Sequence, residues 1–274
     1  MAFLNVLPGA VAEGLIWGLM AIGVYISYKI LDIADLSVDG SICTGACVCV
    51  VLLTAGYPVW ICMLAAIAAG AIAGIVTGLF HTALGIPVIL AGILTQLILY
   101  SVNLAILGGK SLIAINVGST GLLLHMSDNP MAIVAAGTII VLTIVVLWLF
   151  FYTEVGLTIK STGDNQHMSR AQGINTDTMK LVGLILANGL VGISGGLYTQ
   201  YLGSVTVNMG RGAIVIGLAA IFIGLSVSMK IKPNFVVSLV GVIGGGIVYY
   251  IIYNFVVLLG LKTDRKSTRL NSSH

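Results

Sequence analysis

Apolar runs separated by proline, glycine or charged residues divide the chain into segments of similar length. Each run is close to the ~20 residues that an α-helix needs to cross the hydrocarbon core of a bilayer. The pattern predicts membrane spans near residues 8–30, 37–54, 59–80, 87–107, 131–152, 179–198, 211–227 and 234–260. The expected fold class is therefore an all-α, polytopic membrane helix bundle with about eight spans.

The composition supports lipid as the surrounding solvent. The 274 residues are 58% hydrophobic and only 8% charged, and the mean hydropathy is +1.12. An ordinary soluble domain has about 25% charged residues. Too few polar side chains are present to cover a water-facing surface, so most of the outside must face lipid. Eight or nine spans would use the whole length, and any chemistry that needs a soluble domain must come from a partner.

Two of the predicted spans do not resemble simple anchors. One carries Asp32, Asp35 and Asp39 just before Gly40, which favours irregular backbone, and such backbone at membrane depth must be buried in protein or line a cavity. The other, residues 211–224, is short. Both indicate an internal polar path. No internal sequence repeat is evident, which counts against a symmetric inverted-repeat carrier.

Small residues recur at the spacing of helix packing. Glycines four apart let helix backbones approach closely in a membrane. Such pairs and stripes occur at Gly70, Gly74 and Gly78, at Gly192 and Gly196, and at Gly241 and Gly245. We interpret them as packing within a tight bundle.

The distribution of lysine and arginine predicts the orientation. If eight spans alternate, the loops on one side hold Lys29, Lys160, Arg170, Lys180, Lys230 and Lys232, and the other side holds Lys110, Arg211 and Lys262. The excess places the N-terminus outside the cell and residues 153–178 in the cytoplasm.

This predicted cytoplasmic loop is long for a chain that otherwise has short connections. Asp164 is predicted to be the N-cap of a two-turn helix over residues 165–172, with Gly173 and the apolar Ile174 after it. The N-cap of the next span comes from Asn175, Thr176 or Asp177. A short helix held between two spans could act as a lever, and a solvated connecting loop is the alternative that spacing leaves open.

Four segments together resemble one known family. They read ILDIADLSVDGSICTGA from residue 30, GLTIKSTGDNQHMSRAQGIN from residue 156, LANGLVGISGGLYTQ from residue 186 and NMGRGAIVIGLAAIFIG from residue 208. In order and spacing they are similar to permease subunits of ATP-binding-cassette importers, in the branched-chain amino acid and ribose permease superfamily. The resemblance covers nearly all of residues 1–263 and is strongest to a branch associated with amino acid uptake.

The resemblance implies a multi-pass protein of the bacterial plasma membrane that forms the pathway for a small polar nutrient. Its implied partners are ATPase subunits on the cytoplasmic face, an extracytoplasmic substrate-binding protein, and a second permease subunit in a homodimer. Residues 163–173 correspond to the family's coupling helix. The contact residues carried over are Asp164, Asn165, Met168, Arg170, Ala171 and Gly173.

The last residues break the apolar pattern. The sequence DRKSTRLNSSH at 264–274 resembles an in-frame translation of a sequencing adapter, so we interpret it as a non-native tail. The expected organisation is one transmembrane permease domain over residues 1–263, with a further C-terminal helix of the family missing from this copy.

Polar side chains inside the predicted spans are candidates for the translocation path. The main candidates are Asp39, Thr95, Gln96, Asn188 and Ser194, and the same spans also carry Asn103, Tyr198 and Gln200. Hydrogen bonds between membrane helices use the same residue types, so helix packing is the alternative for each. For Asp39 the alternative is to cap a helix that begins at Gly40.

The chain lacks the features of an ATPase, a metalloenzyme or a nucleic-acid-binding protein. Gly109, Lys110 and Ser111 resemble the end of a phosphate loop, but Leu104 stands where that loop needs a glycine. The cations are scattered singly, and the four cysteines have no histidine partner at metal-ligand spacing. We expect no cofactor. The alternative function is an ion-coupled secondary transporter or channel that works without an ATPase, although most acidic residues lie near span ends.

Overall fold

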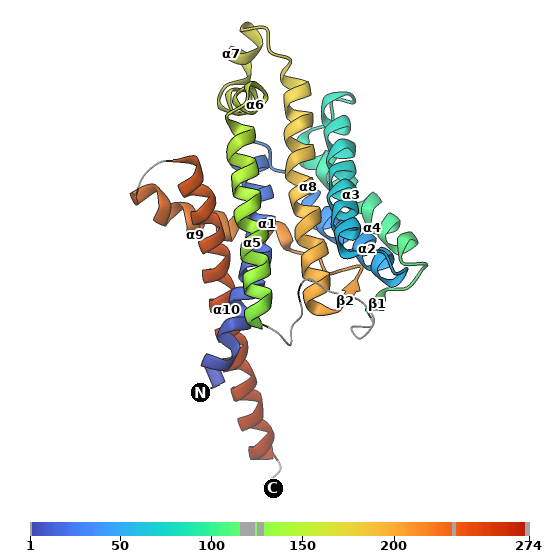
Figure 1. The fold of residues 1–274 in the computed structure, drawn as a ribbon, viewed down its shortest axis with the longest axis vertical. Coiled ribbons are helices and arrows are strands. Elements are labelled where there is room, and N and C mark those ends of the chain that lie inside the picture. The colour runs from blue at the N-terminus through green and yellow to red at the C-terminus, as the bar shows by residue number, and fades with distance from the viewer. Residues whose placement is uncertain (1, 116–123, 125–128, 232–233, 272–274) are drawn as a thin grey trace.

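The computed structural model describes residues 2–115, 124, 129–231 and 234–271, which form helices and one two-stranded sheet (Figure 1). The helices are α1 (Ala2–Tyr25), the π-helix η1 (Ile26–Ile30), α2 (Val38–Thr54), α3 (Val59–Thr82), α4 (Val88–Ile106), α5 (Asn129–Phe151), α6 (Glu154–Asp164), α7 (Gln166–Ala171), α8 (Thr176–Leu202), α9 (Ala213–Ile231) and α10 (Phe235–Asn271). The strands are β1 (Leu112–Ala114) and β2 (Ser204–Thr206).

The all-α class is confirmed, but the number of spans differs from the prediction. Within the described residues, 6 helices are long and apolar enough to cross a membrane: α1 with η1, α3, α4, α5, α8 and α10. The remaining two predicted spans coincide with α2 and α9, which are apolar but shorter. Hydropathy marked these two segments as spans because it measures apolar character. It does not show at what depth in the membrane a helix begins. Lys232, used for the orientation, lies outside the described residues.

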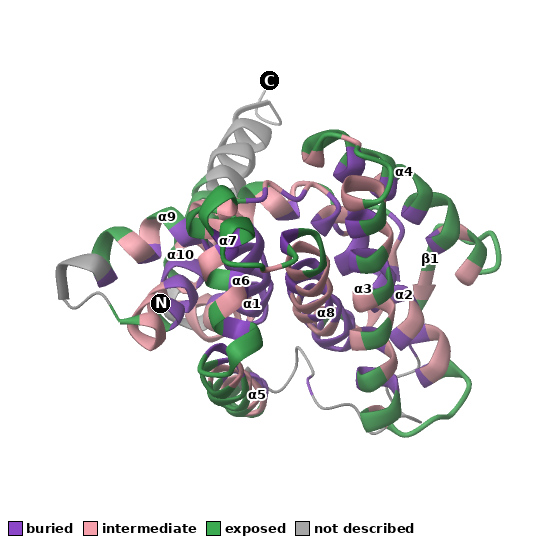
Figure 2. Cartoon of the chain, turned by 90° about the horizontal axis from the view of Figure 1, so that it is seen from above, coloured by how far each residue is buried: buried purple, intermediate pink, exposed green. Residues whose placement is uncertain are grey.

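The core consists of two antiparallel helices, α1 and α8. The Ser194 hydroxyl of α8 donates to the Ile16 carbonyl of α1 at 2.7 Å, and Gly23 of α1 packs on the Ala187 carbonyl of α8. Residue numbers therefore rise along α1 as they fall along α8. Both helices are mostly buried, and they lie side by side in the centre of the view from above (Figure 2).

Each central helix begins a triplet of long, short and long helices. In the first triplet α1 leads through η1 and a break to α2 and then α3, and in the second α8 leads through β2 to α9 and then α10. The triplets exchange partners, because α2 and α3 pack on α8 whereas α9 and α10 pack on α1 (Figure 2). Since α1 and α8 run in opposite directions, the two triplets have inverted arrangements, which the sequence did not reveal as a repeat.

Glycine stripes fit these helix contacts, as the packing interpretation predicted. A Cβ on Gly70 or Gly74 of α3 would overlap the carbonyls of Asn188 and Leu184 in α8. A Cβ on Gly245 of α10 would overlap the Ala220 carbonyl of α9. Backbone therefore packs directly on backbone at these crossings, which gives association without a hydrophobic driving force in lipid.

The two ends of the bundle carry different structures. Helices α6 and α7 lie at one end, at the top of Figure 1, and the short sheet lies near the opposite end of α8. In that sheet β1 and β2 are antiparallel, with Leu112 opposite Thr206. Helix α5 stands at the edge of the bundle (Figure 2), and its outer face exposes large apolar side chains such as Val141, Val145 and Leu149. Helix α10 extends to Asn271, and the interpretation of residues 264–274 as a non-native tail stays a prediction.

Candidate functional site

The first helix break lies inside the bundle, between η1 and α2. The chain leaves the π-helix at Leu31, and Asp32 takes a positive φ of 55°. No regular element covers residues 31–37, which confirms the predicted irregular backbone. Ser37 then precedes the first residue of α2.

A buried carboxylate holds this break. Asp35 is only 2% exposed. Its Oδ1 accepts from the Ser37 backbone N–H at 2.8 Å, and its Oδ2 accepts from the Asn188 side-chain amide at 2.7 Å. A buried charge is tolerated only when its oxygens are paired in this way. Asp35 therefore fixes the start of α2 to the middle of α8.

Asn188 is saturated by these contacts. Its Nδ2 also donates to the Leu184 carbonyl at 3.1 Å, and its Oδ1 accepts from the Ser37 hydroxyl at 3.4 Å. It is fully buried. The structure thus gives this predicted path residue a role as the link between α8 and the first break.

The second helix break lies between α8 and α9. The chain leaves α8 at Gly203, runs through β2, and turns at Gly212, whose φ is +81°. Asp39 of α2 reaches this turn: its Oδ2 accepts from the Gly212 N–H and its Oδ1 from the Ile214 N–H, both at 2.9 Å. The carboxylate of one short helix therefore caps the N-terminus of the other.

The predicted cap at Gly40 was wrong. Asp39 lies inside α2, which begins at Val38, and its partners belong to a segment more than 170 residues later in the chain. Sequence reasoning considers the nearest helix start, whereas a carboxylate binds whichever unpaired N–H groups the fold brings to it.

A cavity of about 320 Å³ adjoins Asp39, between α2, the second half of α4 and the segment before α9. Its walls are Asp39, Gly40, Cys43, Gln96, Leu97, Tyr100, Asn103, Val207 and Arg211. Two predicted path residues, Asp39 and Gln96, meet here. Thr95 instead donates to the Ala91 carbonyl at 3.0 Å, and Ser194 bonds the central helices together.

Sequence reasoning missed Asp35 and Arg211 as members of these sites, whereas Asn103 was marked as a polar residue inside a span that could line a polar route. Asp35 stood in the acidic segment that the analysis marked as irregular, and Arg211 was counted only as a loop cation. A charged residue beside a short apolar segment could have indicated these sites. A helix too short to cross the membrane leaves its first N–H groups inside the membrane region, where they need a polar partner.

At the other end of the bundle, the segment predicted to act as a lever consists of two consecutive helices, α6 and α7. Helix α6 begins at Glu154 after the N-cap Thr153, whose hydroxyl accepts from the Gly156 N–H at 3.3 Å. Helix α7 follows after the single residue Asn165. The sequence had predicted only the second helix.

The N-cap of α7 is Asn165 and not Asp164. The Asn165 Oδ1 accepts from the Met168 N–H at 3.0 Å, while Asp164 is the last residue of α6. The prediction was wrong because Asp164 belongs to the end of α6. The first residue free to cap α7 is therefore Asn165. The predicted cap of α8 is confirmed at Asn175, which accepts from the Thr178 N–H at 3.2 Å.

The end of α7 matches the prediction. Gly173 has a φ of +83°, the left-handed conformation that glycine adopts without a steric cost. Its N–H donates to the Arg170 carbonyl at 3.0 Å, and the Ile174 N–H donates to the Ser169 carbonyl at 3.1 Å. This pair of bonds is the Schellman motif that closes a helix.

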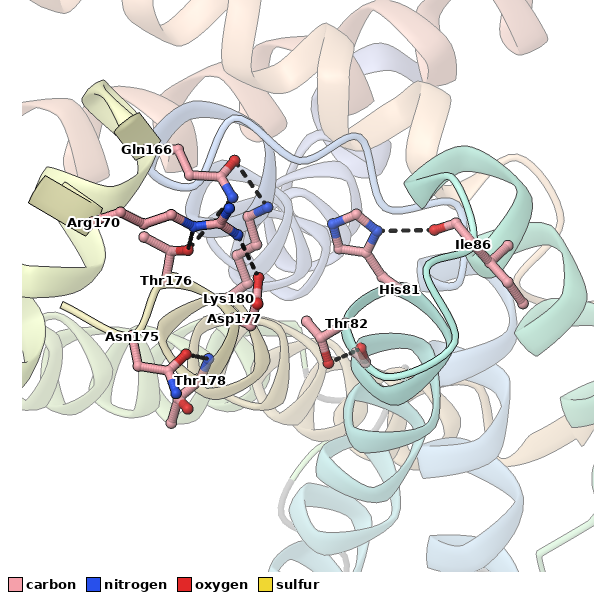
Figure 3. A network of polar contacts seen from close by, with 11 residues as sticks. His81, Thr82, Ile86, Gln166, Arg170, Asn175, Thr176, Asp177, Thr178 and Lys180 are labelled. Carbon is pink, nitrogen blue, oxygen red and sulfur yellow. Dashed lines mark hydrogen bonds and ion pairs between the residues drawn. The ribbon is translucent and has the colours of Figure 1, made fainter. Parts of the chain in front are cut away.

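Side chains bind α7 to its neighbours (Figure 3). Arg170 donates from Nε to the Thr176 hydroxyl at 2.7 Å and forms an ion pair with Asp177 at 3.1 Å. Gln166 accepts from Lys180 at 3.1 Å. On the α6 side, the Ser169 and Ser161 hydroxyls are 2.9 Å apart. The short helix is therefore fixed to both α6 and α8.

All six residues predicted to contact an ATPase are exposed: Asp164, Asn165, Met168, Arg170, Ala171 and Gly173. Met168 is 59% exposed although its side chain is apolar. Arg170 is the member whose guanidinium is already engaged within the chain.

The described part of the chain has 6 helices that are long and apolar enough to cross a membrane, with polar helix breaks inside the bundle. This is the architecture of a multi-pass transport protein. Residues 8–270 match the family model described as the branched-chain amino acid transport system / permease component, and the chain belongs to this family. It is therefore a permease component of an ATP-binding-cassette transport system for a small solute, located in the bacterial plasma membrane, and it is a transport subunit and not an enzyme.

Curated relatives carry related names. A tyrosine transport system permease protein of Clostridioides difficile (strain R20291) is 39% identical over 255 residues, which are 93% of this chain and 84% of that protein. An uncharacterised protein of Rickettsia prowazekii (strain Madrid E) is 28% identical over 85% of this chain and 81% of its own length. The autoinducer 2 import system permease protein LsrC of Salmonella choleraesuis (strain SC-B67) is 29% identical over 69% of this chain and 54% of its own. No solved structure matches the chain.

Proposed function

We propose that this chain forms the membrane pathway through which an importer moves a free amino acid, and that α7 receives the force from a separate ATPase. One observation carries the coupling: α7 is bound to α6 and α8 on one face and exposed on the other. Ser169 on the bound face is fully buried, whereas Met168 beside it is 59% exposed.

The bound face makes α7 a rigid lever. A push on α7 reaches α8 through Arg170 and Gln166, and it reaches α6 through Ser169. Helix α6 in turn packs on the end of η1, because a Cβ on Gly163 would overlap the Ile30 carbonyl. Force on one short helix is thus passed to α8 and to the end of α1, the two central helices of the bundle.

The exposed face offers a docking surface. His167, Met168 and Ala171 are exposed at the spacing of one face of α7, and Asp164 at the end of α6 is exposed as well. An exposed apolar Met168 flanked by polar groups is typical of a protein contact. In this proposal the face lies in the cytoplasm, as the cation count predicts, and the ATPase binds it.

The amino acid substrate rests on the tyrosine transport relative. The proposal includes a substrate-binding protein at the opposite end and a second permease copy. Arg211 is exposed and lines the cavity together with the exposed Leu97 and Tyr100. A charge there is costly in contact with acyl chains, so protein or water must cover this surface.

The test uses the complete complex reconstituted in vesicles with ATP inside. We expect Arg170→Glu and Gly173→Pro each to reduce substrate-stimulated ATP hydrolysis and uptake to background. Glutamate would repel Asp177, and proline cannot adopt the positive φ of Gly173 or donate its hydrogen bond.

The matched control is Lys110→Glu, a charge reversal at an exposed loop residue after α4. It should leave both activities unchanged, and all variants should insert and purify in equal yield. Unchanged coupling in Arg170→Glu and Gly173→Pro would overturn the proposal. Accumulation of solute by vesicles that contain this subunit alone would favour a secondary carrier instead.

A further inference from the structure

The cavity beside Asp39 differs in its chemistry from a second cavity of similar size. The second cavity, about 350 Å³, lies between α3, α5 and α8, and its only polar side chain is Thr143. The cavity beside Asp39 has a carboxylate, a guanidinium, two carboxamides and a phenol in its walls. The cavity beside Asp39 therefore offers charged and polar partners to a solute, whereas the second cavity offers no charged group.

The two charges of this cavity remain available for a ligand. Asp39 accepts one N–H on each carboxylate oxygen, which leaves half of its roughly four lone-pair sites unused. Arg211 forms no ion pair or hydrogen bond through its side chain with the residues that the structure describes. The two residues line one cavity, and no ion pair joins them.

A third group lacks its partner. Asn103 is 1% exposed and lines the cavity, and its Oδ1 has no hydrogen-bond donor among the described residues. A buried carbonyl oxygen without a donor is destabilising, and a bound ligand that supplies an N–H removes that cost. The unpartnered oxygen thus points to a ligand with a donor group.

The size of the cavity limits the ligand. Small-molecule sites usually measure ~300–1,000 Å³, and 320 Å³ lies at the lower end. Exposed Leu97 and Tyr100 form its apolar part. The ligand is therefore small, carries both charges, and has a side chain that tolerates apolar and aromatic surroundings.

We propose that this cavity binds the zwitterion of a free α-amino acid, with the ligand carboxylate on Arg211 and its ammonium group between Asp39 and the Asn103 Oδ1. The assignment rests on the proposed transport of an amino acid, and it adds a binding site within the permease itself. Because Asp39 also caps α9, the ammonium group would contact the residue that joins the two short helices.

The experiment measures binding to the permease–ATPase complex in lipid nanodiscs, without the binding protein. Each common amino acid is titrated, and the best binder is compared with its decarboxylated amine and its deaminated acid. We expect saturable binding of an amino acid and at least ~10-fold weaker binding of both analogues, since each leaves one charged group of the site unpaired.

Variants separate the site from general effects on folding. Arg211→Gln and Asn103→Leu should each weaken amino acid binding ~10-fold or more, and Lys110→Gln should not change it. Asn103→Leu removes an unpartnered oxygen, so its apparent melting temperature without ligand should be equal to or above that of the wild type while its affinity falls. A purely structural role of Asn103 predicts a fall in both.

Uptake by the full complex, with the binding protein present, is the reference for the proposed function. If the wild-type complex takes up an amino acid but binds none in nanodiscs, or if Arg211→Gln and Asn103→Leu bind it as the wild type does, the site is wrong and the proposed function stands. Equal binding of the amine or the acid would also overturn the site. Absence of ATP-dependent amino acid uptake by the wild-type complex would instead refute the proposed function.

Discussion

At both helix breaks a carboxylate accepts hydrogen bonds from backbone N–H groups inside the bundle, but the carboxylate comes from a different part of the chain in each case. Each break leaves the first N–H groups of a short helix, α2 or α9, unpaired inside the bundle. At the first break Asp35 accepts from Ser37 two residues away. At the second, the carboxylate comes from Asp39, which belongs to the other triplet.

Both carboxylates reach the other triplet, but they bind different parts of it. Asp35 fastens α2 to its own preceding segment and to Asn188 of α8. Asp39 joins the N-termini of α2 and α9, so the two triplets meet at its carboxylate. The Asp39 carboxylate therefore links the two short helices directly, and the cavity that contains Asp39 lies at this junction.

The largest expected effect comes from separating α2 from α8. A Cβ on Gly195 would overlap the Ile42 carbonyl, and backbone cannot move aside as a side chain can. Gly195→Val should therefore cost more than ~3 kcal/mol and prevent recovery of monodisperse protein in detergent. Gly137→Val is the control, since nothing lies within 4 Å of a Cβ there. Equal melting temperatures of the two variants would contradict this packing.

Removing the first carboxylate should have the next largest effect. Asp35→Ala leaves the Ser37 N–H and the Asn188 amide without an acceptor in the interior, which should cost ~2–4 kcal/mol. Adding Asn188→Ala to Asp35→Ala should cost less than the sum of the single changes, because one network is lost only once. Thermal unfolding of the four proteins in one detergent measures this, and strict additivity would disprove the link.

Removing the second carboxylate should have a smaller, more local effect. Asp39→Ala removes an N-cap, worth ~1–2 kcal/mol. Hydrogen exchange should become faster in the first turn of α9, at residues 213–216, and stay unchanged at the start of α2. Asp35→Ala should show the reverse pattern. Faster exchange only in α2 after Asp39→Ala would mean that the carboxylate does not join the triplets.

The smallest effect on stability is expected for an exposed carboxylate. Asp177 and Arg170 form an ion pair with side chains 51% and 52% exposed, and such pairs contribute ~0–1 kcal/mol. Arg170→Gln should shift the melting temperature little, in contrast to Asp35→Ala. A shift as large as that of Asp35→Ala would show that burial is not what distinguishes the carboxylates.

Much of the fold follows from local pattern. Every predicted apolar segment coincides with a helix, and the irregular backbone before α2 follows from three aspartates close together. Gly173 and Asn175 were recognised because a helix end and a helix cap depend on residues within one turn. The cap of α7 was displaced by one residue because α6, an amphipathic helix in a polar loop, was not anticipated.

The candidate sites were less predictable, because their partners are distant in sequence. Asn188 and Ser194 were correctly marked as polar groups inside a span, yet their packing roles depend on Asp35 and Ile16. Asp39 was marked as a cap, but for the wrong helix. Asn103 was marked as a polar residue inside a span and Arg211 only as a loop cation, and the structure alone places both beside Asp39 at one cavity.

The sequence by itself determined that this protein lies in a membrane, where its helices are, and which glycines permit close packing, since burial in lipid and helix geometry depend on composition and on neighbours within a turn. The tertiary structure alone decided that α2 and α9 begin inside the bundle and which carboxylate accepts from which helix end. It also decided that α2 and α3 pack on α8 while α9 and α10 pack on α1. The physical reason is that unpaired backbone groups inside a membrane protein must find acceptors wherever the fold supplies them, and no local pattern specifies an acceptor that lies 173 residues away.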